Sequence, residues 1–238
     1  MKIKTSKLSE LKKKKISKTK SIKSELIKFD LSYEEALIGI DEVGRGALAG
    51  PVYAAALHFP ELKKLKDKWT LDIIDSKLLK EGKRIELSIF IKDNSLWSIR
   101  QASCNEINEI GILPATLLAM RRATDDVIKQ MSNTNEILLL IDGISRIKDY
   151  EYKQTTIKKG DYKSFHIAAA SIIAKTARDQ HMKEISEQYP HYAWERNVGY
   201  GTQAHCDGIL KNGASKEHRV KFIRNILEKS TQLSILQK

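Results

Sequence analysis

The sequence predicts a single α/β domain built on a mixed β-sheet that is flanked by helices. Two uninterrupted apolar runs, residues 53–57 and 137–141, are typical of strands that are covered on both faces. Strand patterns come first along the chain, and helical patterns mixed with further strands follow, as expected of an α/β architecture. No linker divides residues 33–228, so we expect one domain rather than two.

Five segments have the character of β-strands. Each is a short apolar or alternating run that is bounded by polar or glycine-containing residues. They lie at residues 36–40, 52–59, 96–102, 137–141 and 152–157. A mixed five-stranded sheet is therefore expected.

Helices are expected between and after these strands, at residues 76–92, 105–110, 113–131, 164–189 and 220–229. Asp75 or Ser76 has the side chain to cap the first of them. Pro114 stands in the first turn of the third, where a missing N–H costs nothing. The last helix belongs to a C-terminal helical extension.

Composition places the chain among ordinary globular proteins. Hydrophobic residues make up 41% of 238, and no apolar run approaches the roughly 18 residues of a membrane span. The N-terminus lacks the apolar stretch of a secretory signal, and Cys104 and Cys206 form neither a metal-binding pair nor a disulfide framework. We expect a cytoplasmic protein with reduced thiols, without a membrane partner, and a monomer.

The positive charge is concentrated at the N-terminus. Residues 1–28 hold eleven lysines against Glu10 and Glu25, which is +9 of the total net charge of +12. We predict that residues 1–30 are a disordered tail, that residues 31–230 form the catalytic domain with its helical extension, and that residues 231–238 are a second tail. A sharper hypothesis makes the lysine-rich tail a non-specific tether for nucleic acid.

Acidic side chains follow apolar segments at three places. Asp41 and Glu42 come directly after residues 36–40, Asp142 follows residues 137–141, and Asp161 lies in a Lys-Gly-Asp sequence. Carboxylates gathered at strand ends are hard oxygen ligands that suit Mg²⁺ or Mn²⁺. Two such ions about 3.5–4 Å apart can position a water and stabilise the leaving oxygen in phosphodiester cleavage.

A glycine-flanked arginine follows the acidic pair. Gly44 and Gly46 allow positive φ or close approach to a ligand, and Arg45 between them suits phosphate. Neighbouring residues of a regular strand point to opposite faces, so we expect the strand to end or bulge at Asp41 and Glu42 if they share a metal centre.

Each motif alone has an ordinary structural explanation. An Asp-Gly such as Asp142-Gly143 is commonly a turn, and an Asp-Glu pair also occurs at helix N-termini. Tyr200 is alternatively an aromatic residue of the hydrophobic core, and Lys175 is alternatively an ordinary solvent-exposed lysine. The joint occurrence of the acids with Gly44-Arg45-Gly46 favours catalysis.

Together these residues resemble the motifs of ribonuclease HII, the type 2 ribonuclease H. The resemblance begins at Ile40-Asp41-Glu42-Val43-Gly44-Arg45-Gly46 and ends at His218-Arg219. Between them, in the order of the family, stand Asp75-Ser76-Lys77-Leu78, Ile141-Asp142-Gly143, Lys159-Gly160-Asp161, Ala168-Ala169-Ala170-Ser171, Lys175, Gly199-Tyr200-Gly201-Thr202 and His205.

This resemblance implies a ribonuclease H-like fold and an endonuclease that cleaves the RNA strand of RNA–DNA hybrids. It also implies incision at single ribonucleotides in duplex DNA, which leaves 3′-hydroxyl and 5′-phosphate ends. By motif, the metal-binding and catalytic carboxylates would be Asp41, Glu42, Asp142 and Asp161. Gly44, Arg45 and Gly46 would recognise the 2′-hydroxyl and nearby phosphates, Tyr200 would stack at the RNA–DNA junction, and Ser76, Lys77 and Lys175 would hold the phosphate backbone.

The chain departs from the family pattern at two points. Val198 stands where the family usually has a lysine before Gly-Tyr, which removes one phosphate contact. The segment after Asp142-Gly143 lacks a common proline and is slightly long. The related ribonuclease HIII usually reads Gly-Thr-Gly in place of Gly44-Arg45-Gly46.

Two other functions remain open from the residues alone. One is a DNA nuclease or transferase with the same kind of acidic cluster, which would ignore the 2′-hydroxyl. The other is a basic nucleic-acid-binding protein whose acids are structural. A duplex with one ribonucleotide, tested beside an all-DNA duplex, distinguishes the three.

Overall fold

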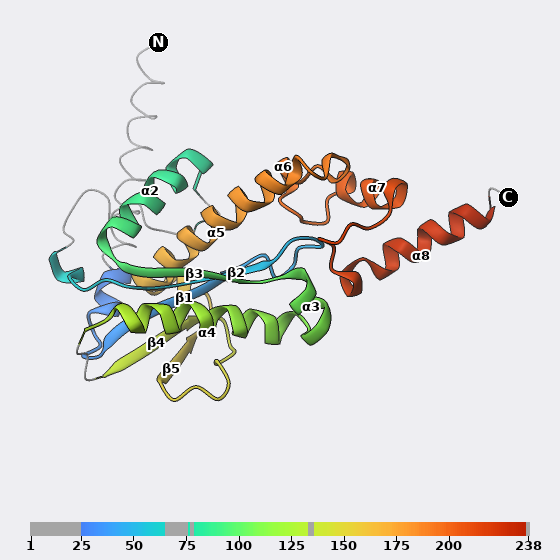
Figure 1. Cartoon of the computed structure of the whole chain (residues 1–238). Coiled ribbons are helices and arrows are strands. Elements are labelled where there is room, and N and C mark those ends of the chain that lie inside the picture. The colour runs from blue at the N-terminus through green and yellow to red at the C-terminus, as the bar shows by residue number, and fades with distance from the viewer. Residues whose placement is uncertain (1–24, 65–75, 77–78, 133–135, 237–238) are drawn as a thin grey trace, which may run out of the picture.

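A computed structural model describes residues 25–64, 76, 79–132 and 136–236 of the chain. Its centre is a mixed five-stranded sheet in the order β3-β2-β1-β4-β5 (Figure 1). The strands are β1 (Ala36–Val43), β2 (Val52–His58), β3 (Leu96–Ala102), β4 (Ile137–Asp142) and β5 (Lys153–Ile157). β1, β2 and β3 pair antiparallel, whereas β4 and β5 run parallel to β1.

Helices cover both faces of the sheet (Figure 1). The element α4 (Ile112–Gln130) lies on one face, after the short α3 (Cys104–Ile110), and α2 (Glu81–Asn94) and α5 (Phe165–Ser186) lie on the other. Beyond α5, the chain forms α6 (Trp194–Asn197), α7 (Gln203–Asn212) and α8 (Val220–Leu236), and α8 extends away from the sheet. The predicted architecture is confirmed.

Alternate residues of the central strands fill the two layers of the core. Ile38 and Ile40 of β1 pack with α4, whereas Leu37 contacts Ile167 of α5. The hydrophobic runs were predictable because both faces of β1, β2 and β4 are covered. None of the described helices is both long and apolar enough to cross a membrane.

Several predicted boundaries are wrong. The helix expected from Asp75 or Ser76 begins at Glu81 with Lys80 as its N-cap, and residue 75 lies outside the described residues. The last helix continues to Leu236, so the predicted second tail is mostly helical. β1 runs through Asp41 and Glu42 to Val43 instead of ending at residue 40.

The predicted N-terminal tail is shorter than 30 residues. Residues 25–30 are helical, Leu26 is buried, and Asp30 accepts a hydrogen bond from the backbone N–H of His166. Residues 1–24 lie outside the described residues, so the tail there stays a prediction.

Candidate active site

The four predicted carboxylates line one cavity at the end of β1 and β4. Asp41 and Glu42 stand on β1, Asp142 is the last residue of β4, and Asp161 lies in the 3₁₀ turn Gly160–Tyr162. The cavity has a volume of about 370 Å³, and its lining is Asp41, Glu42, Val43, Ser76, Asp142, Asp161, Ser171, Lys175 and Tyr200. Segments far apart in the sequence therefore meet here.

Asp41 and Glu42 reach this cavity without any break in the strand. β1 stays paired with β2 in regular register, Asp41 opposite Ala55 and Glu42 opposite Ala54, so the expected end or bulge is wrong. The pairing of β1 with β4, in contrast, stops at Ile40. Past that point the β1 edge is open, and side chains from both faces of the strand can turn round it into one space.

Burial and mutual repulsion make this acidic cluster costly. Burial raises the pKa of Asp41 well above its usual range, and the charges of Glu42 and Asp142 raise it further. The pKa of Glu42 is also raised, by burial first, although its hydrogen bond to Arg45 opposes the shift. A bound cation would relieve the same repulsion, because it favours the ionised carboxylates.

The carboxylates suit a hard divalent cation, although three of them form hydrogen bonds or an ion pair with neighbouring protein groups. Among the described residues, no three His, Cys, Asp or Glu side chains are gathered closely enough to hold a metal as they stand. Asp41 Oδ1 accepts from Glu42 N at 2.7 Å, Asp142 Oδ1 accepts from Gly160 N at 2.7 Å, and Glu42 pairs with Arg45 at 3.0 Å. All four acids supply carboxylate oxygens, the ligands that Mg²⁺ and Mn²⁺ prefer.

Polar side chains from α5 complete the cavity. Ser171 bonds to Asp41 and lies 3.0 Å from Ser76, Oγ to Oγ. Lys175, one turn further along α5, is partly buried and donates to Asp179 at 2.6 Å. Lys175 is therefore an ion-paired lysine in the cavity wall and not a freely solvated surface lysine. Lys77 lies outside the described residues.

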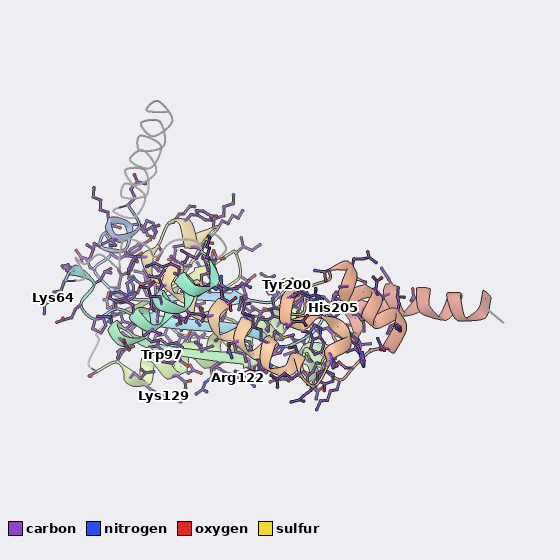
Figure 2. All side chains as sticks on the ribbon, turned by 90° about the horizontal axis from the view of Figure 1, so that it is seen from above. Lys64, Trp97, Arg122, Lys129, Tyr200 and His205 are labelled. Carbon is purple, nitrogen blue, oxygen red and sulfur yellow. The ribbon has the colours of Figure 1, made fainter. Side chains whose placement is uncertain are left out.

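Tyr200 is a wall of the cavity rather than part of the core. Its ring is half-buried, and the guanidinium of Arg178 lies 5.5 Å from the ring centroid. Its backbone carbonyl accepts from His205 Nδ1 at 3.0 Å, and the two residues lie together in Figure 2. One face of the ring is thus supported from behind.

The Gly44–Gly46 loop leaves the rim of the cavity. Gly44 has φ of +93°, and a Cβ there would lie 2.2 Å from Arg178 Nε, so only glycine fits. Gly46 does not have a positive φ, and no atom lies near its Cβ position. Of the two glycines, only Gly44 therefore adopts the positive φ that favours glycine. The side chain of Arg45 is 50% exposed.

Sequence reasoning missed Ser171 and Asp179 as parts of the site. Asp179 joins Lys175 to Arg84 of α2, whose Nη2 lies 2.9 Å from its carboxylate. The available signal was helical spacing, because Ser171, Lys175 and Asp179 recur every four residues on one face of α5.

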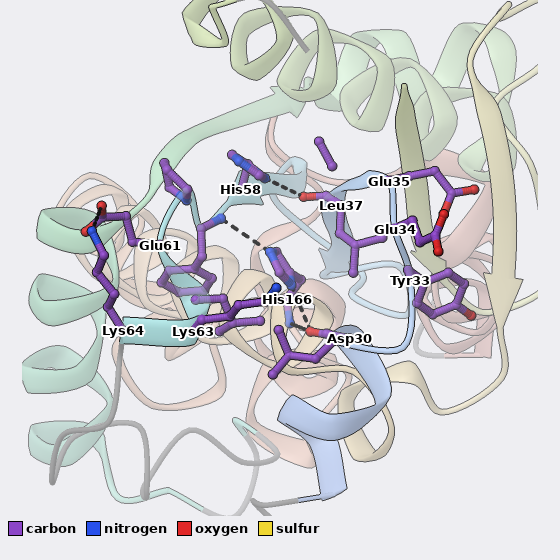
Figure 3. A pocket seen from close by; sticks show the side chains of 15 residues that line it. Asp30, Tyr33, Glu34, Glu35, Leu37, His58, Glu61, Lys63, Lys64 and His166 are labelled. Carbon is purple, nitrogen blue, oxygen red and sulfur yellow. Dashed lines mark hydrogen bonds and ion pairs between the residues drawn. The ribbon is translucent and has the colours of Figure 1, made fainter. Parts of the chain in front are cut away.

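A second cavity, of about 390 Å³, lies at the other end of β1 (Figure 3). Its floor is a buried pair in which His166 Nδ1 lies 2.8 Å from Asp30 Oδ2. Phe59 N donates to the other ring nitrogen of His166 at 3.3 Å. Because both ring nitrogens are engaged, this histidine holds α5 in place and is not free for catalysis.

Comparisons with known proteins identify the family of the chain. The model of the family described as ribonuclease HII matches residues 38–225. The chain belongs to the ribonuclease HII family. Ribonuclease HII of Fusobacterium nucleatum subsp. nucleatum is 46% identical over 201 residues, which cover 84% of this chain and 91% of that protein. Membership of this ribonuclease H family makes the chain a nuclease, a hydrolase of phosphodiester bonds.

Solved structures share the fold. The ribonuclease H2 from Pyrococcus horikoshii OT3 aligns with a TM-score of 0.63 at 22% identity, over 82% of this chain and 98% of that one. A Bst-RNase HIII in complex with Mn²⁺ aligns with a TM-score of 0.69 at 16% identity, over 86% and 73% of the two chains. Residues 38–225, which the family model matches, include all four acids.

Proposed function

We propose that this chain cleaves the RNA strand of RNA–DNA hybrids and incises at single ribonucleotides embedded in duplex DNA. Cleavage would leave 3′-hydroxyl and 5′-phosphate ends and would need Mg²⁺ or Mn²⁺. The observation that carries the proposal is the convergence of Asp41, Glu42, Asp142 and Asp161 on one cavity that also contains Ser76, Lys175 and Tyr200.

The four carboxylates are proposed to hold two divalent cations. When bound, such cations would lower the pKa of an attacking water and stabilise the negative charge that develops on the leaving oxygen. Asp41 and Glu42 are suited to this because burial, and after it the repulsion between the acids, raises their pKa values, and a cation favours the ionised carboxylates. Asp142 and Asp161 complete the donor set from the neighbouring strand and turn.

The remaining residues are proposed to position the substrate. Lys175 and Ser76 lie beside the acids, where an ammonium and a hydroxyl can hold the scissile phosphate against the carboxylates. Lys77 and Arg45 would contact neighbouring phosphates. Arg45 is half exposed, so its guanidinium can exchange Glu42 for a phosphate when a cation takes over Glu42.

Recognition of the ribose is proposed for the Gly44–Gly46 loop and Tyr200. The 2′-hydroxyl is the group that separates RNA from DNA, so its reader must come within hydrogen-bond distance. The two glycines let the loop backbone approach a sugar that closely. The half-buried Tyr200 ring offers a flat surface for the adjoining nucleotide.

Replacing Asp41 or Asp142 by asparagine should abolish cleavage. We expect the rate to fall by about three orders of magnitude or more, because an amide cannot replace an anionic metal ligand. Asp41→Asn should leave the free energy of unfolding unchanged or raise it, since it removes a buried and repelled charge. Activity is measured on a labelled duplex and stability by urea unfolding. A near-normal rate in a folded variant contradicts the site assignment.

One substrate pair tests the function itself. A duplex with a single ribonucleotide and the same duplex in all-DNA form are incubated with enzyme and Mg²⁺ or Mn²⁺. We expect cutting only of the first, at the ribonucleotide. Equal cutting of both indicates a DNA nuclease, and cutting of neither, with binding retained, indicates a nucleic-acid-binding protein.

A further inference from the structure

The loop that carries Arg45 and the loop that carries Tyr200 are joined by backbone hydrogen bonds. Leu48 N and Ala49 N both donate to Gly199 O, at 2.8 and 3.2 Å. The segment before α8 adds to this junction, because Gly50 N donates to Glu217 O at 2.8 Å and Arg219 N donates to Leu48 O at 2.9 Å. Three segments therefore form one unit at the rim of the acidic cavity.

Arg178 of α5 lies behind this unit and is completely buried. Its Nε donates to Pro51 O at 3.0 Å, its Nη2 to Ala49 O at 3.1 Å, and its Nη1 to Val198 O at 2.9 Å. The same guanidinium supports the Tyr200 ring, and its Nε fills the space that a Cβ of Gly44 would need. One side chain thus touches both loops.

Arg219 is equally buried and holds the other side of the first loop. Its Nε and Nη2 donate to Gly50 O at 3.0 and 2.8 Å, and its Nη1 donates to Arg45 O at 3.0 Å. The backbone of Arg45, whose side chain is proposed to contact phosphate, is therefore fixed from the interior. Burial lowers the pKa of Arg219 to about 10, which leaves it charged at neutral pH.

Burying two guanidinium groups is expensive, and apolar side chains would fill the same space at lower cost. The hydrogen bonds that offset this cost go to main-chain carbonyls of the two loops, not to carboxylates. A planar fork of donors defines the distance and orientation of several carbonyls at once. The arrangement is suited to hold one loop geometry before substrate arrives.

We propose that Arg178 and Arg219 are positioning residues that hold the Gly44–Gly46 loop and Tyr200 as one pre-formed surface for reading the ribose. The inference rests on the proposed function, in which these two elements recognise the ribonucleotide. Neither arginine touches substrate. Discrimination at the 2′ position depends on them because a hydrogen bond to the sugar is lost when its partner moves by about 1 Å.

The first test measures discrimination in Arg178→Lys and Arg219→Lys. A lysine keeps the charge but cannot bridge two carbonyls. Cleavage efficiency, kcat/KM, is measured on a duplex with one ribonucleotide and on the same duplex with a 2′-fluoro nucleotide there. We expect the hydroxyl-to-fluoro ratio to fall about tenfold or more in both variants, mainly through kcat. An unchanged ratio in either folded variant overturns the proposal for that residue.

The matched control is Ile223→Ala. Ile223 of α8 is fully buried in a hydrophobic cluster with Ala49 and Trp194, and its backbone N–H donates to Arg219 O rather than to either loop. It should lower the melting temperature while the hydroxyl-to-fluoro ratio stays at the wild-type value. A ratio that falls in this variant as far as in the arginine variants means that general loosening, not positioning, is responsible.

The second test uses the unaltered protein and does not depend on whether the variants fold. Hydrogen exchange is followed at the amides of Leu48, Gly50 and Arg219, with and without the 2′-fluoro duplex. A pre-formed surface predicts slow exchange in the free protein and less than a threefold further slowing with duplex, as expected for amides already in stable hydrogen bonds. Fast exchange that the duplex slows about tenfold or more shows that substrate assembles the loops, and refutes the proposal.

Different results refute the proposed function and the positioning role of the two arginines. A wild-type enzyme that cuts the ribonucleotide duplex and the all-DNA duplex equally refutes the proposed function, whatever the variants do. A wild-type enzyme that requires the hydroxyl, together with arginine variants that require it equally, refutes only the positioning role.

Discussion

Val198 has a strained backbone conformation two residues before Tyr200. It has φ of +42°, a left-handed conformation that β-branched residues rarely adopt and that costs about 1–3 kcal/mol. Its N–H donates to Trp194 O and its carbonyl accepts from Arg178, so its neighbours impose the conformation. The next two residues are Gly199 and Tyr200, and the strain is therefore located where the second loop enters the site.

Replacing Val198 by lysine should strengthen substrate binding. The substitution removes a β-branched side chain from a left-handed position and adds a positive charge two residues before Tyr200, where it can pair with one more phosphate. We expect the slope of log affinity against log salt to become steeper by about 0.9 for the one added contact. Binding of the 2′-fluoro duplex is titrated at several salt concentrations. Val198→Ala is the control, since it relieves the strain without charge; equal slopes for the two variants contradict the prediction.

At the scale of elements, the close packing of α5 on β1 builds the cavity. Gly39 has no side chain, and a Cβ there would lie 2.3 Å from the backbone carbon of His166. The adjoining turns of α5 present Ala168, Ala169 and Ala170, all fully buried. Because the two backbones approach so closely, Ser171 bonds to Asp41 of β1 and Lys175 lines the same cavity.

Gly39→Ala should destabilise the fold through this contact. The clash is with backbone atoms, which cannot rotate away, so we expect a loss of about 2–4 kcal/mol in the free energy of unfolding. Gly82→Ala is the matched control: Gly82 lies in α2 with open space around its Cβ position, and the change should gain up to about 1 kcal/mol. Urea unfolding measures both. A loss below 1 kcal/mol at Gly39 means that α5 can shift away from β1.

The helices and strands were largely predictable from the sequence. The errors arise where tertiary contacts override local sequence preferences. Uninterrupted apolar runs located the strands because the sheet is covered on both faces. The expected cap at Ser76 is wrong because its hydroxyl bonds to Ser171 instead, and α2 begins at Glu81. β1 was predicted too short because its acids looked like a strand end, whereas pairing with β2 continues through both.

The candidate site could be predicted from the sequence where its chemistry shows in neighbouring residues. Four acids that follow apolar runs or a glycine indicated a cation site, and the structure brings them to one cavity. The supporting residues were not predictable in the same way. Arg178 and Arg219 act on carbonyls of residues far away in the chain, and nothing in the local sequence shows which carbonyls those are.

For the molecule as a whole, the basic charge lies mainly in residues 1–24, which hold ten lysines and one glutamate. If this segment is a tether, its removal should weaken binding of any duplex and flatten the salt dependence, while leaving the hydroxyl-to-fluoro ratio of cleavage unchanged. The cut falls before Leu26, which packs in the core. An unchanged salt slope in the shortened chain excludes the tether.

Buried neutral histidines connect the C-terminal helices to the rest of the molecule. His205 Nδ1 donates to Tyr200 O, and its Nε2 accepts from Trp194 Nε1 and from His218 Nε2. Ser215 N donates to the remaining nitrogen of His218 at 2.9 Å. These partners assign each ring one proton. A second proton, on His218 Nδ1, would break the hydrogen bond from Ser215 N, although Ser215 Oγ lies 2.9 Å away and can accept it. Burial, with the neighbouring His205, lowers the pKa of His218 to about 4, and burial lowers that of His205 as well.

This histidine pair should make the protein lose stability in mild acid. The unfolded chain takes up a proton near pH 6.5, whereas folded His218 does so only near pH 4, so its stabilising effect is complete above pH 6.5 and is lost as the pH falls toward 4. The loss should reach about 2–3 kcal/mol by about pH 4.5. Asp41 and Glu42, with raised pKa values, act in the opposite direction, so the histidine contribution has to be isolated. His218→Asn does this: its side-chain oxygen can still accept from Ser215, but it does not titrate. Urea unfolding of both proteins between pH 7.5 and 4.5 should give a clearly flatter profile for the variant, and parallel profiles would show that His218 is not the group responsible.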